Sequence, residues 1–150
     1  MPVPDRGALP FDRVTVGDTF SVSRTITDAE IALFATLSGD LNPLHLSDTA
    51  ARASRYGKRI ATGQHTIAIM MGAVANHFSG YGKFVGLEFS ARLHAAVGAG
   101  DTLEVDWRVA ETIPKPQAAG GLVVLEGTGR SQDGTLLITA TGKVLLSETL

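Results

Sequence analysis

The spacing of apolar and polar residues divides the chain into a helical first half and a β-rich second half. Over residues 85–94 and 102–110, apolar and polar residues alternate with a period of two, which is typical of strands with one face on a core. Two further strands are predicted on either side of the Asp133-Gly134 pair, a dipeptide typical of β-hairpin turns. Residues 113–121 are predicted as the loop before this hairpin. We therefore expect four antiparallel strands in the second half.

The first half is predicted to begin with a strand over residues 20–27, followed by helices. Thr27 and Glu30 have the spacing of a capping box, which marks the start of a helix. Gly39 is expected to end this helix, since glycine commonly follows a last helical turn. Residues at helical spacing lie between the two ends. The face expected to be apolar consists of Ile31, Leu33, Phe34, Ala35, Leu37 and Ser38.

Two more helices complete the predicted order of elements. Residues 47–54 indicate a short helix capped by Ser47 or Asp48. Residues 62–78 are apolar nearly all round the middle of a longer helix, so this helix should be buried on most sides. A strand, helices, a long buried helix and four antiparallel strands predict an α+β fold with a helix packed on one sheet. We expect one domain over residues 1–150, without repeat or linker.

Composition narrows the classes of protein to consider. The 150 residues are 44% hydrophobic and 19% charged, as in a soluble globular protein, and the net charge of −2 suggests no nucleic-acid partner. The chain has no cysteine, which excludes disulfides and cysteine nucleophiles and fits a reducing compartment. No signal peptide is recognisable, and the longest apolar run, residues 67–75, is too short to span a bilayer. We expect a cytoplasmic protein without membrane partners.

Candidate chemistry is concentrated between Asp40 and His45, on a stretch expected to be irregular. A carboxylate beside an imidazole can orient and activate water, and loops often carry such groups. Pro43 between them stiffens the spacing, and it disfavours helical backbone at Asn42. The structural alternative is a turn, because Asp and Asn commonly form turns and caps. Spacing alone does not decide between the two.

Residues 34–51, "FATLSGDLNPLHLSDTAA", resemble the hydratase-2 motif of the MaoC-like dehydratases, the (R)-specific enoyl-CoA hydratases. The matching positions are Phe34, Ser38, Gly39, Asp40, Asn42, Pro43, His45 and Ala51. The resemblance continues in "RIATGQHT" and "FSARLHAAVGAGDTL" and covers roughly residues 18–147, after an N-terminal extension over residues 1–17. It implies the hotdog fold, in which an antiparallel sheet wraps a long central helix and a catalytic loop overhangs the site.

The resemblance also implies an activity and a set of site residues. Members of this family add water to a trans-2-enoyl-CoA and give a (3R)-3-hydroxyacyl-CoA, reversibly, as part of fatty acid metabolism. Asp40 and His45 are the implied catalytic residues, and the N–H of Gly63 would bind the thioester carbonyl. The implied supporting residues are Ser38, Asn42 and Pro43. We expect no cofactor beyond the coenzyme A thioester of the substrate, no metal, and a homodimer or a dimer of dimers.

Some positions depart from the family pattern. Arg59 stands where proline is frequent, and Gln64 and His65 replace a more usual aliphatic stretch. Gln64 and His65 are therefore candidates for the acyl pocket, although a hydrogen-bonded structural role is favoured for His65. These two residues leave open a branched or dicarboxylic acyl-CoA as substrate.

Two other functions remain as alternatives. A hotdog thioesterase often carries an acidic residue on its central helix, whereas residues 62–80 contain none. A non-catalytic hotdog subunit is the second alternative. Lys83, Arg92 and Lys115 could bind the phosphates of coenzyme A. For each of them, an ordinary solvent-exposed charge is the favoured interpretation.

Overall fold

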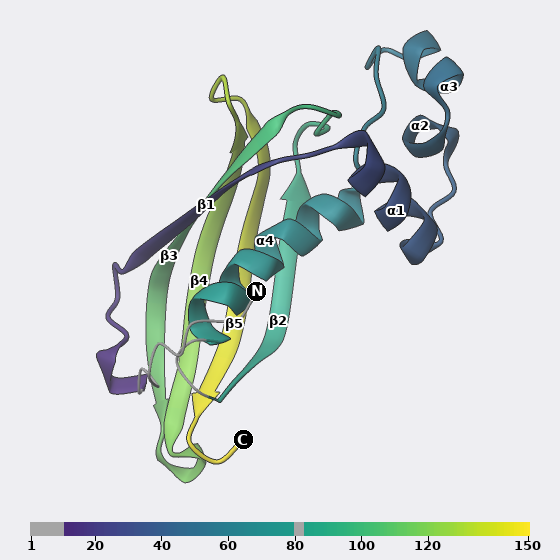
Figure 1. Cartoon of the computed structure of the whole chain (residues 1–150). Coiled ribbons are helices and arrows are strands. Elements are labelled where there is room, and N and C mark those ends of the chain that lie inside the picture. The colour runs from purple at the N-terminus through teal and green to yellow at the C-terminus, as the bar shows by residue number, and fades with distance from the viewer. Residues whose placement is uncertain (1–10, 80–82) are drawn as a thin grey trace.

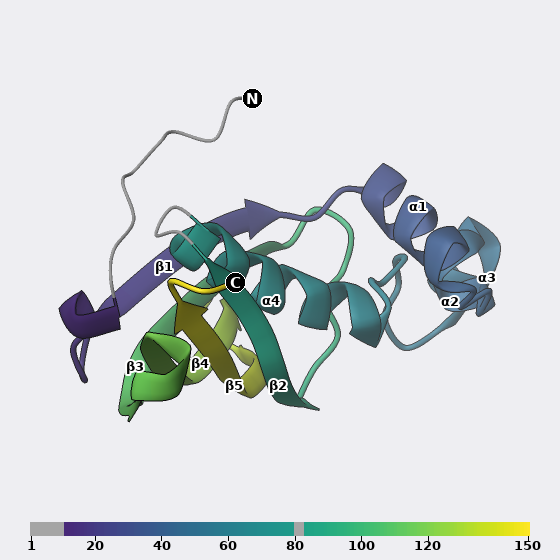
Figure 2. The same ribbon diagram turned by 90° about the horizontal axis from the view of Figure 1, so that it is seen from below.

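A five-stranded antiparallel sheet curves around one long helix (Figures 1 and 2). This computed structural model describes residues 11–79 and 83–150. The strand order in the sheet is β1-β3-β4-β5-β2, so that β1 and β2 are the edge strands. The strands are β1 (Thr19–Thr25), β2 (Phe84–Leu93), β3 (Thr102–Lys115), β4 (Gly120–Ser131) and β5 (Leu136–Ser147). This is the hotdog arrangement and confirms the expected fold class.

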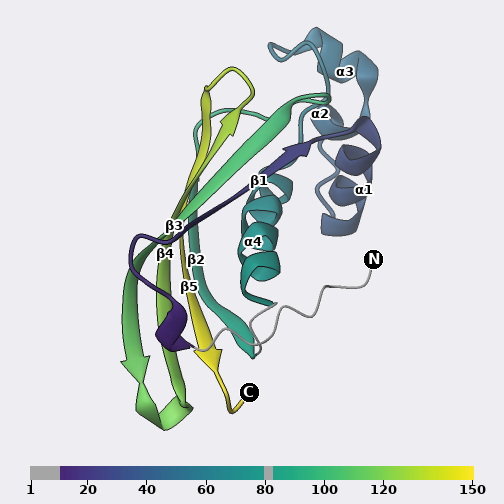
Figure 3. The ribbon, with the colours of Figure 1, turned by 60° about the vertical axis from the view of Figure 1, so that its left-hand side comes forward.

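The helices form two groups. Helix α4 (Gly63–Ser79) lies against the concave face of the sheet, with β1 and β2 on its two sides (Figure 2). Three short helices stand beyond the N-terminal end of α4, away from the sheet (Figures 1 and 3). They are α1 (Asp28–Ser38), α2 (Pro43–Leu46) and α3 (Asp48–Ala53), and we call them the helical cap.

The core lies between α4 and the middle strands. Trp107 on β3 is buried, and its Nε1–H donates a hydrogen bond to the Met70 carbonyl on α4 at 3.2 Å. Gly127 on β4 leaves room for the indole, since a Cβ there would lie 2.6 Å from the ring. Apolar side chains surround this contact. The buried set includes Leu103, Val105, Val109, Val123, Leu125, Ile138, Ile69, Val74 and Phe78.

The predicted turns and caps are confirmed. The Thr27 side chain accepts from the Glu30 N–H, and the Glu30 side chain accepts from the Thr27 N–H, which completes the capping box. Gly39 ends α1 in the left-handed conformation with φ 76°, where glycine is favoured. Gly134 in the β4–β5 hairpin has φ 87°.

The predicted loop over residues 113–121 is wrong. Strand β3 continues to Lys115 and pairs with β4, and only Pro116–Ala118 forms a short 3-10 turn. A shift in register between Val109 and Glu111 explains the error. An irregularity of this kind changes which face the following residues occupy, so simple alternation fails beyond it.

Several apolar residues expected on core faces are exposed. Leu33 and Leu37 of α1 are 61% and 76% exposed, because the helical cap stands off the sheet. On β2, alternation predicts one buried face, but β2 is an edge strand with an irregular register between Gly86 and Glu88. Its exposed apolar residues are Val85, Leu87 and Leu93.

Candidate active site

The stretch from Asp40 to His45 is more regular than its sequence suggests. Gly39 ends α1, and Asp40 lies in the connection to α2, where Pro43–Leu46 forms a single helical turn. The expectation of an irregular segment is therefore wrong for its second half. Pro43 occupies the first helical turn, where its missing N–H costs nothing and its fixed φ suits the helix. Asn42 caps this turn, as its Oδ1 accepts from the Leu44 N–H at 3.0 Å.

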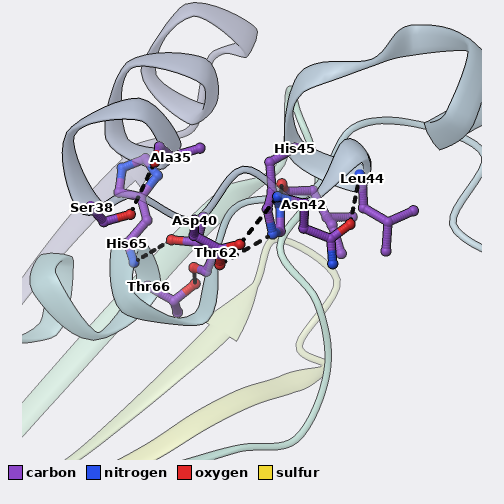
Figure 4. A network of polar contacts seen from close by, with 10 residues as sticks. Ala35, Ser38, Asp40, Asn42, Leu44, His45, Thr62, His65 and Thr66 are labelled. Atoms are coloured by element: carbon purple, nitrogen blue, oxygen red, sulfur yellow. Dashed lines mark hydrogen bonds and ion pairs between the residues drawn. The ribbon is translucent and has the colours of Figure 1, made fainter.

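His45 is buried, and its ring orientation is fixed by one hydrogen bond. Its Nδ1 lies 2.7 Å from the carbonyl oxygen of Ile60 (Figure 4). Because a carbonyl only accepts, Nδ1 carries a proton, and in the neutral ring Nε2 then has a free lone pair. The Ile60 N–H in turn donates to the Leu44 carbonyl at 3.3 Å. Both the N–H and the carbonyl of Ile60 therefore bind α2 to the segment before α4.

Asp40 faces the free nitrogen of His45. Asp40 Oδ2 and His45 Nε2 are 3.6 Å apart, longer than a direct hydrogen bond (Figure 4). The other carboxylate oxygen, Oδ1, accepts from the Asn42 N–H at 3.3 Å. The Asp40 side chain is 29% exposed, so one face of the pair is open. The arrangement places two hydrogen-bond acceptors, Asp40 Oδ2 and His45 Nε2, around one small space.

Gly63 begins α4 three residues after the carbonyl that holds His45. Thr62 is buried just before it, and its Oγ1 accepts from the His65 N–H at 3.0 Å. Among residues 11–79 and 83–150, none accepts from the Gly63 N–H. A Cβ at position 63 would lie 2.6 Å from Cδ1 of Leu93, so only glycine fits this contact without movement. A free N–H at a helix N-terminus favours negative charge on a nearby atom.

The other residues singled out from the sequence differ in how near they lie to Asp40 and His45. The Ser38 hydroxyl donates to the Ala35 carbonyl at 3.2 Å, which ties it to the last turn of α1 (Figure 4). Gln64 is exposed. Arg92 is near the end of β2 that reaches Gly63, because the next residue is Leu93. Lys83 lies at the opposite end of β2, and its Nζ donates to the Glu148 carbonyl. Lys115 ends β3.

His65 is buried and stacks on Phe34 of α1, with ring centroids 4.7 Å apart. Its Nδ1 has no hydrogen-bond partner among the residues that the structure describes. Burial lowers the pKa of His65 from its ordinary value, which favours the neutral ring. The ring lines a cavity of about 230 Å³ between β1, α1 and α4, together with Arg24, Phe34 and Asn76.

A second, apolar cavity of about 450 Å³ lies between α4 and β2. Its lining includes Met71, Val74, Ala75, Phe84, Leu87, Phe89 and Val144. Met71 lies on the helix that was expected to be buried on most sides, but its side chain is 45% exposed. The apolar residues 71, 74 and 75 share one face of α4 by helical spacing, which was the signal for this cavity.

Residues 11–79 and 83–150 lack two other kinds of feature, a membrane-spanning helix and a metal-binding cluster. No helix there is long and apolar enough to cross a membrane. The same residues contain no group of three or more His, Asp or Glu side chains placed to hold a metal ion.

Comparisons with known proteins agree on one family. The family model described as "MaoC like domain" matches residues 14–124. The chain is 32% identical to a 3-hydroxybutyryl-CoA dehydratase from Methylorubrum extorquens over 83% of this chain and 84% of that protein. It is 27% identical to an (R)-specific enoyl-CoA hydratase from Rhodospirillum rubrum, over 88% and 93% of the two chains.

Solved structures extend the comparison to the fold. An R-hydratase from Pseudomonas aeruginosa in its unliganded form superposes with a TM-score of 0.84, over 94% of this chain and 87% of the other, at 28% identity. An (R)-hydratase from Aeromonas caviae gives a TM-score of 0.79, with 89% and 98% of the chains covered at 26% identity. The family model covers most of the chain, and a relative that is 32% identical is matched over most of its length, so the chain belongs to the MaoC-like domain family.

Proposed function

We propose that the protein is a hydro-lyase that adds water to a trans-2-enoyl-CoA and gives a (3R)-3-hydroxyacyl-CoA, reversibly. The observation that carries the proposal is the facing pair of Asp40 and His45, 3.6 Å apart, and the Gly63 N–H at the start of α4 is the proposed partner of the thioester carbonyl. The activities named for the relatives from Methylorubrum extorquens and Rhodospirillum rubrum support the same reaction class.

The water is held between the two catalytic groups. Because His45 Nδ1 donates to Ile60, Nε2 is an acceptor, and so is the Asp40 carboxylate. One water can donate a hydrogen bond to each of them. Asn42 keeps this geometry by capping α2 and by donating its N–H to Asp40. Two bases around one water suit general acid–base catalysis, in which a group must be within hydrogen-bond reach of the proton it takes.

The addition follows from this placement. The water oxygen bonds to C3, and the proton it loses passes to Asp40 or His45. The π electrons of the C2–C3 bond move toward the thioester oxygen, and C2 then receives a proton from the site. The Gly63 N–H and the N-terminal end of α4 stabilise the charge that builds on that oxygen. H and OH are added without a net change in oxidation state, so we propose that no redox cofactor is used.

We propose that the acyl chain lies in the apolar cavity between α4 and β2. Met71 in its wall is eight residues beyond Gly63, which is about 12 Å along the helix axis. Apolar walls from Val74 and Phe89 suit an alkyl chain. The cavity volume of about 450 Å³ suits an acyl group longer than crotonyl as well as crotonyl itself.

A second copy of the chain is proposed to cover the edge strand β2. Val85, Leu87 and Leu93 are exposed there, and an uncovered apolar edge strand favours association. The protein is thus proposed to be a homodimer, in the cytoplasm, with an acyl-CoA as its small-molecule partner. Light scattering that gives a monomer at micromolar concentration would contradict the dimer.

One observation favours an acyl-CoA with a polar substituent on its acyl group as substrate. The His65 ring lines the smaller cavity, and its buried Nδ1 has no hydrogen-bond partner among the described residues, so a ligand group that reached this atom with a small movement of the ring would gain a hydrogen bond. An acyl group with a carboxyl or hydroxyl substituent would supply one. The reaction would be the same hydration.

The test is a spectrophotometric assay of the purified protein with crotonyl-CoA and a C8 enoyl-CoA. We expect loss of the enoyl-thioester absorbance, formation of the (3R) product, and no release of free coenzyme A thiol. Thiol release would indicate a thioesterase instead. Inactivity toward both substrates and toward a dicarboxylic enoyl-CoA would favour a non-catalytic subunit.

A further inference from the structure

Apolar packing and a small set of polar and aromatic contacts join the helical cap to the rest of the molecule, and Ile31 of α1 belongs to the buried core. Asp40 and His45 lie on the cap (Figure 4), whereas Gly63 is the first residue of α4. The distance between the catalytic pair and the Gly63 N–H therefore depends on how the cap is held. The stacking of Phe34 on His65 is one such contact, and the bond from His45 to Ile60 is another.

Arg59 makes a third contact, and it joins two cap helices at once. Its Nη2 lies 3.2 Å from Asp28 Oδ1 and its Nε lies 2.9 Å from Asp48 Oδ1, as ion pairs, although the buried Nε has no aligned hydrogen-bond partner among the described residues. Asp28 is the first residue of α1, and Asp48 is the first residue of α3. The Arg59 side chain is only 18% exposed, while the two aspartates are 60% and 65% exposed. One largely buried guanidinium thus holds the starting points of two helices.

The backbone of Arg59 is fixed to the sheet side of the molecule. Its carbonyl accepts from the Ala99 N–H at 2.9 Å, in the connection between β2 and β3. The next residue, Ile60, carries the carbonyl that orients the His45 ring. Arg59 therefore connects a firmly held backbone segment to the cap.

Each aspartate begins a helix that is connected along the chain to one catalytic residue. Asp28 begins the helix that ends directly before Gly39 and Asp40. Asp48 begins the helix that follows the turn of His45. Helix N-termini carry partial positive charge, so the two carboxylates also separate the Arg59 cation from two helix ends that would repel it.

We propose that Arg59 is a positioning residue, whose ion pairs with Asp28 and Asp48 set the placement of Asp40 and His45 relative to Gly63. The proposal rests on the proposed hydratase function. Asp28 and Asp48 are exposed and stay solvated without Arg59, so we expect the loss of Arg59 to affect catalytic geometry more than the free energy of unfolding. Misplacing a reacting group by about 1 Å typically costs about 100-fold in rate.

The experiment compares Arg59→Met with Lys58→Met. Lys58 is the neighbouring cation, and it pairs with Asp101 at 2.6 Å, on the sheet side and not on the cap. We expect Arg59→Met to lower kcat about tenfold to 100-fold, with a melting midpoint within about 4 °C of wild type. Lys58→Met should keep a kcat near that of wild type.

Conservative variants separate positioning from folding. Arg59→Lys should give an intermediate kcat, since an ammonium group lacks the fork that contacts two carboxylates. Asp28→Asn combined with Asp48→Asn keeps Arg59 and should reproduce the loss. Adding Arg59→Met to that pair should lower kcat little further, because the three side chains act as a unit. Wild-type kcat in Arg59→Met, or in the double aspartate variant, would overturn the proposal.

A second readout does not depend on activity. The Nδ1–H of His45 donates to Ile60, so its NMR resonance reports the placement of the ring. We expect this resonance to shift or broaden in Arg59→Met and to stay unchanged in Lys58→Met. An unchanged resonance in both would overturn the positioning role. If wild type hydrates no enoyl thioester, the proposed function fails, and this measurement still decides the role of Arg59.

Discussion

Replacing Gly63 by alanine tests the role of the α4 N-terminus in catalysis. The new Cβ would lie 2.6 Å from Leu93 Cδ1, whereas carbon atoms pack at about 3.5–4.0 Å. The Leu93 side chain or the start of α4 must therefore move by about 1 Å. A displacement of that size in the carbonyl-binding N–H predicts a loss of about 100-fold in kcat/KM, or about 2.7 kcal/mol at 1.36 kcal/mol per tenfold.

The fold should tolerate this change. Gly63 does not have a positive φ, so alanine fits its backbone conformation. Leu93 is 48% exposed and can rotate away from the new methyl group. Alanine is also the better helix former, by about 1 kcal/mol in a helix interior and less at an end. We expect the free energy of unfolding to change by about 1 kcal/mol or less.

The assay is hydration of crotonyl-CoA by wild type, Gly63→Ala, Leu93→Ala and the double variant. If displacement causes the loss, the double variant should recover activity, because truncation of Leu93 removes the clash. If the methyl group itself blocks the carbonyl, the double variant should stay as slow as Gly63→Ala. Full kcat/KM in Gly63→Ala would refute the reasoning, since it would show that the new methyl group neither displaces the start of α4 nor obstructs the thioester carbonyl.

Three other predictions concern stability, the cavity and assembly. Hydrogen bonds from Arg24 and from the backbone of Thr27 lower the pKa of Glu30 from 4.5 to about 2, so the stabilisation by Glu30 is present above pH 4.5 and is lost as the pH falls toward 2. Glu30→Gln should flatten the pH dependence of the unfolding free energy in that window, and an unchanged slope would contradict this. Ala75→Phe should narrow the apolar cavity and lower kcat/KM for the C8 substrate at least about tenfold relative to crotonyl-CoA, and an unchanged ratio would place the acyl chain elsewhere. Leu87→Lys should place a charge on the exposed edge strand and shift the dimer toward monomer in light scattering, whereas an unaffected dimer would exclude β2 from the interface.

Local signals in the sequence predict most of the elements of the fold. The capping box of Thr27 and Glu30 depends on adjacent residues, and so does the hairpin at Asp133-Gly134. Alternation predicts β3 up to the register shift near Val109 and fails beyond it. Periodicity also does not show whether another helix or sheet covers the apolar face of a strand. For this reason Leu87 on an edge strand was expected in the core and is exposed.

The site was predictable where residues close in sequence make it. The spacing of Asp40 and His45 indicates the chemistry, and the resemblance adds Gly63 at the start of the central helix. Contacts between distant segments were not predictable. The bond from His45 to Ile60 sets the tautomer of the imidazole, and the ion pairs of Arg59 join two helix starts. Arg59 was recognisable in the sequence only as a departure from the family pattern.

The measurement that tests the central claim most directly is crotonyl-CoA hydration by wild type and Asp40→Asn in parallel. The asparagine keeps an oxygen that can accept from the Asn42 N–H, so the fold and the melting midpoint should be retained. It removes the carboxylate that shares the water with His45, and loss of such a group typically costs about 10² to 10⁴ in rate. We expect an active wild type and a variant slower by at least about 100-fold. Near-wild-type turnover by a folded Asp40→Asn would contradict this.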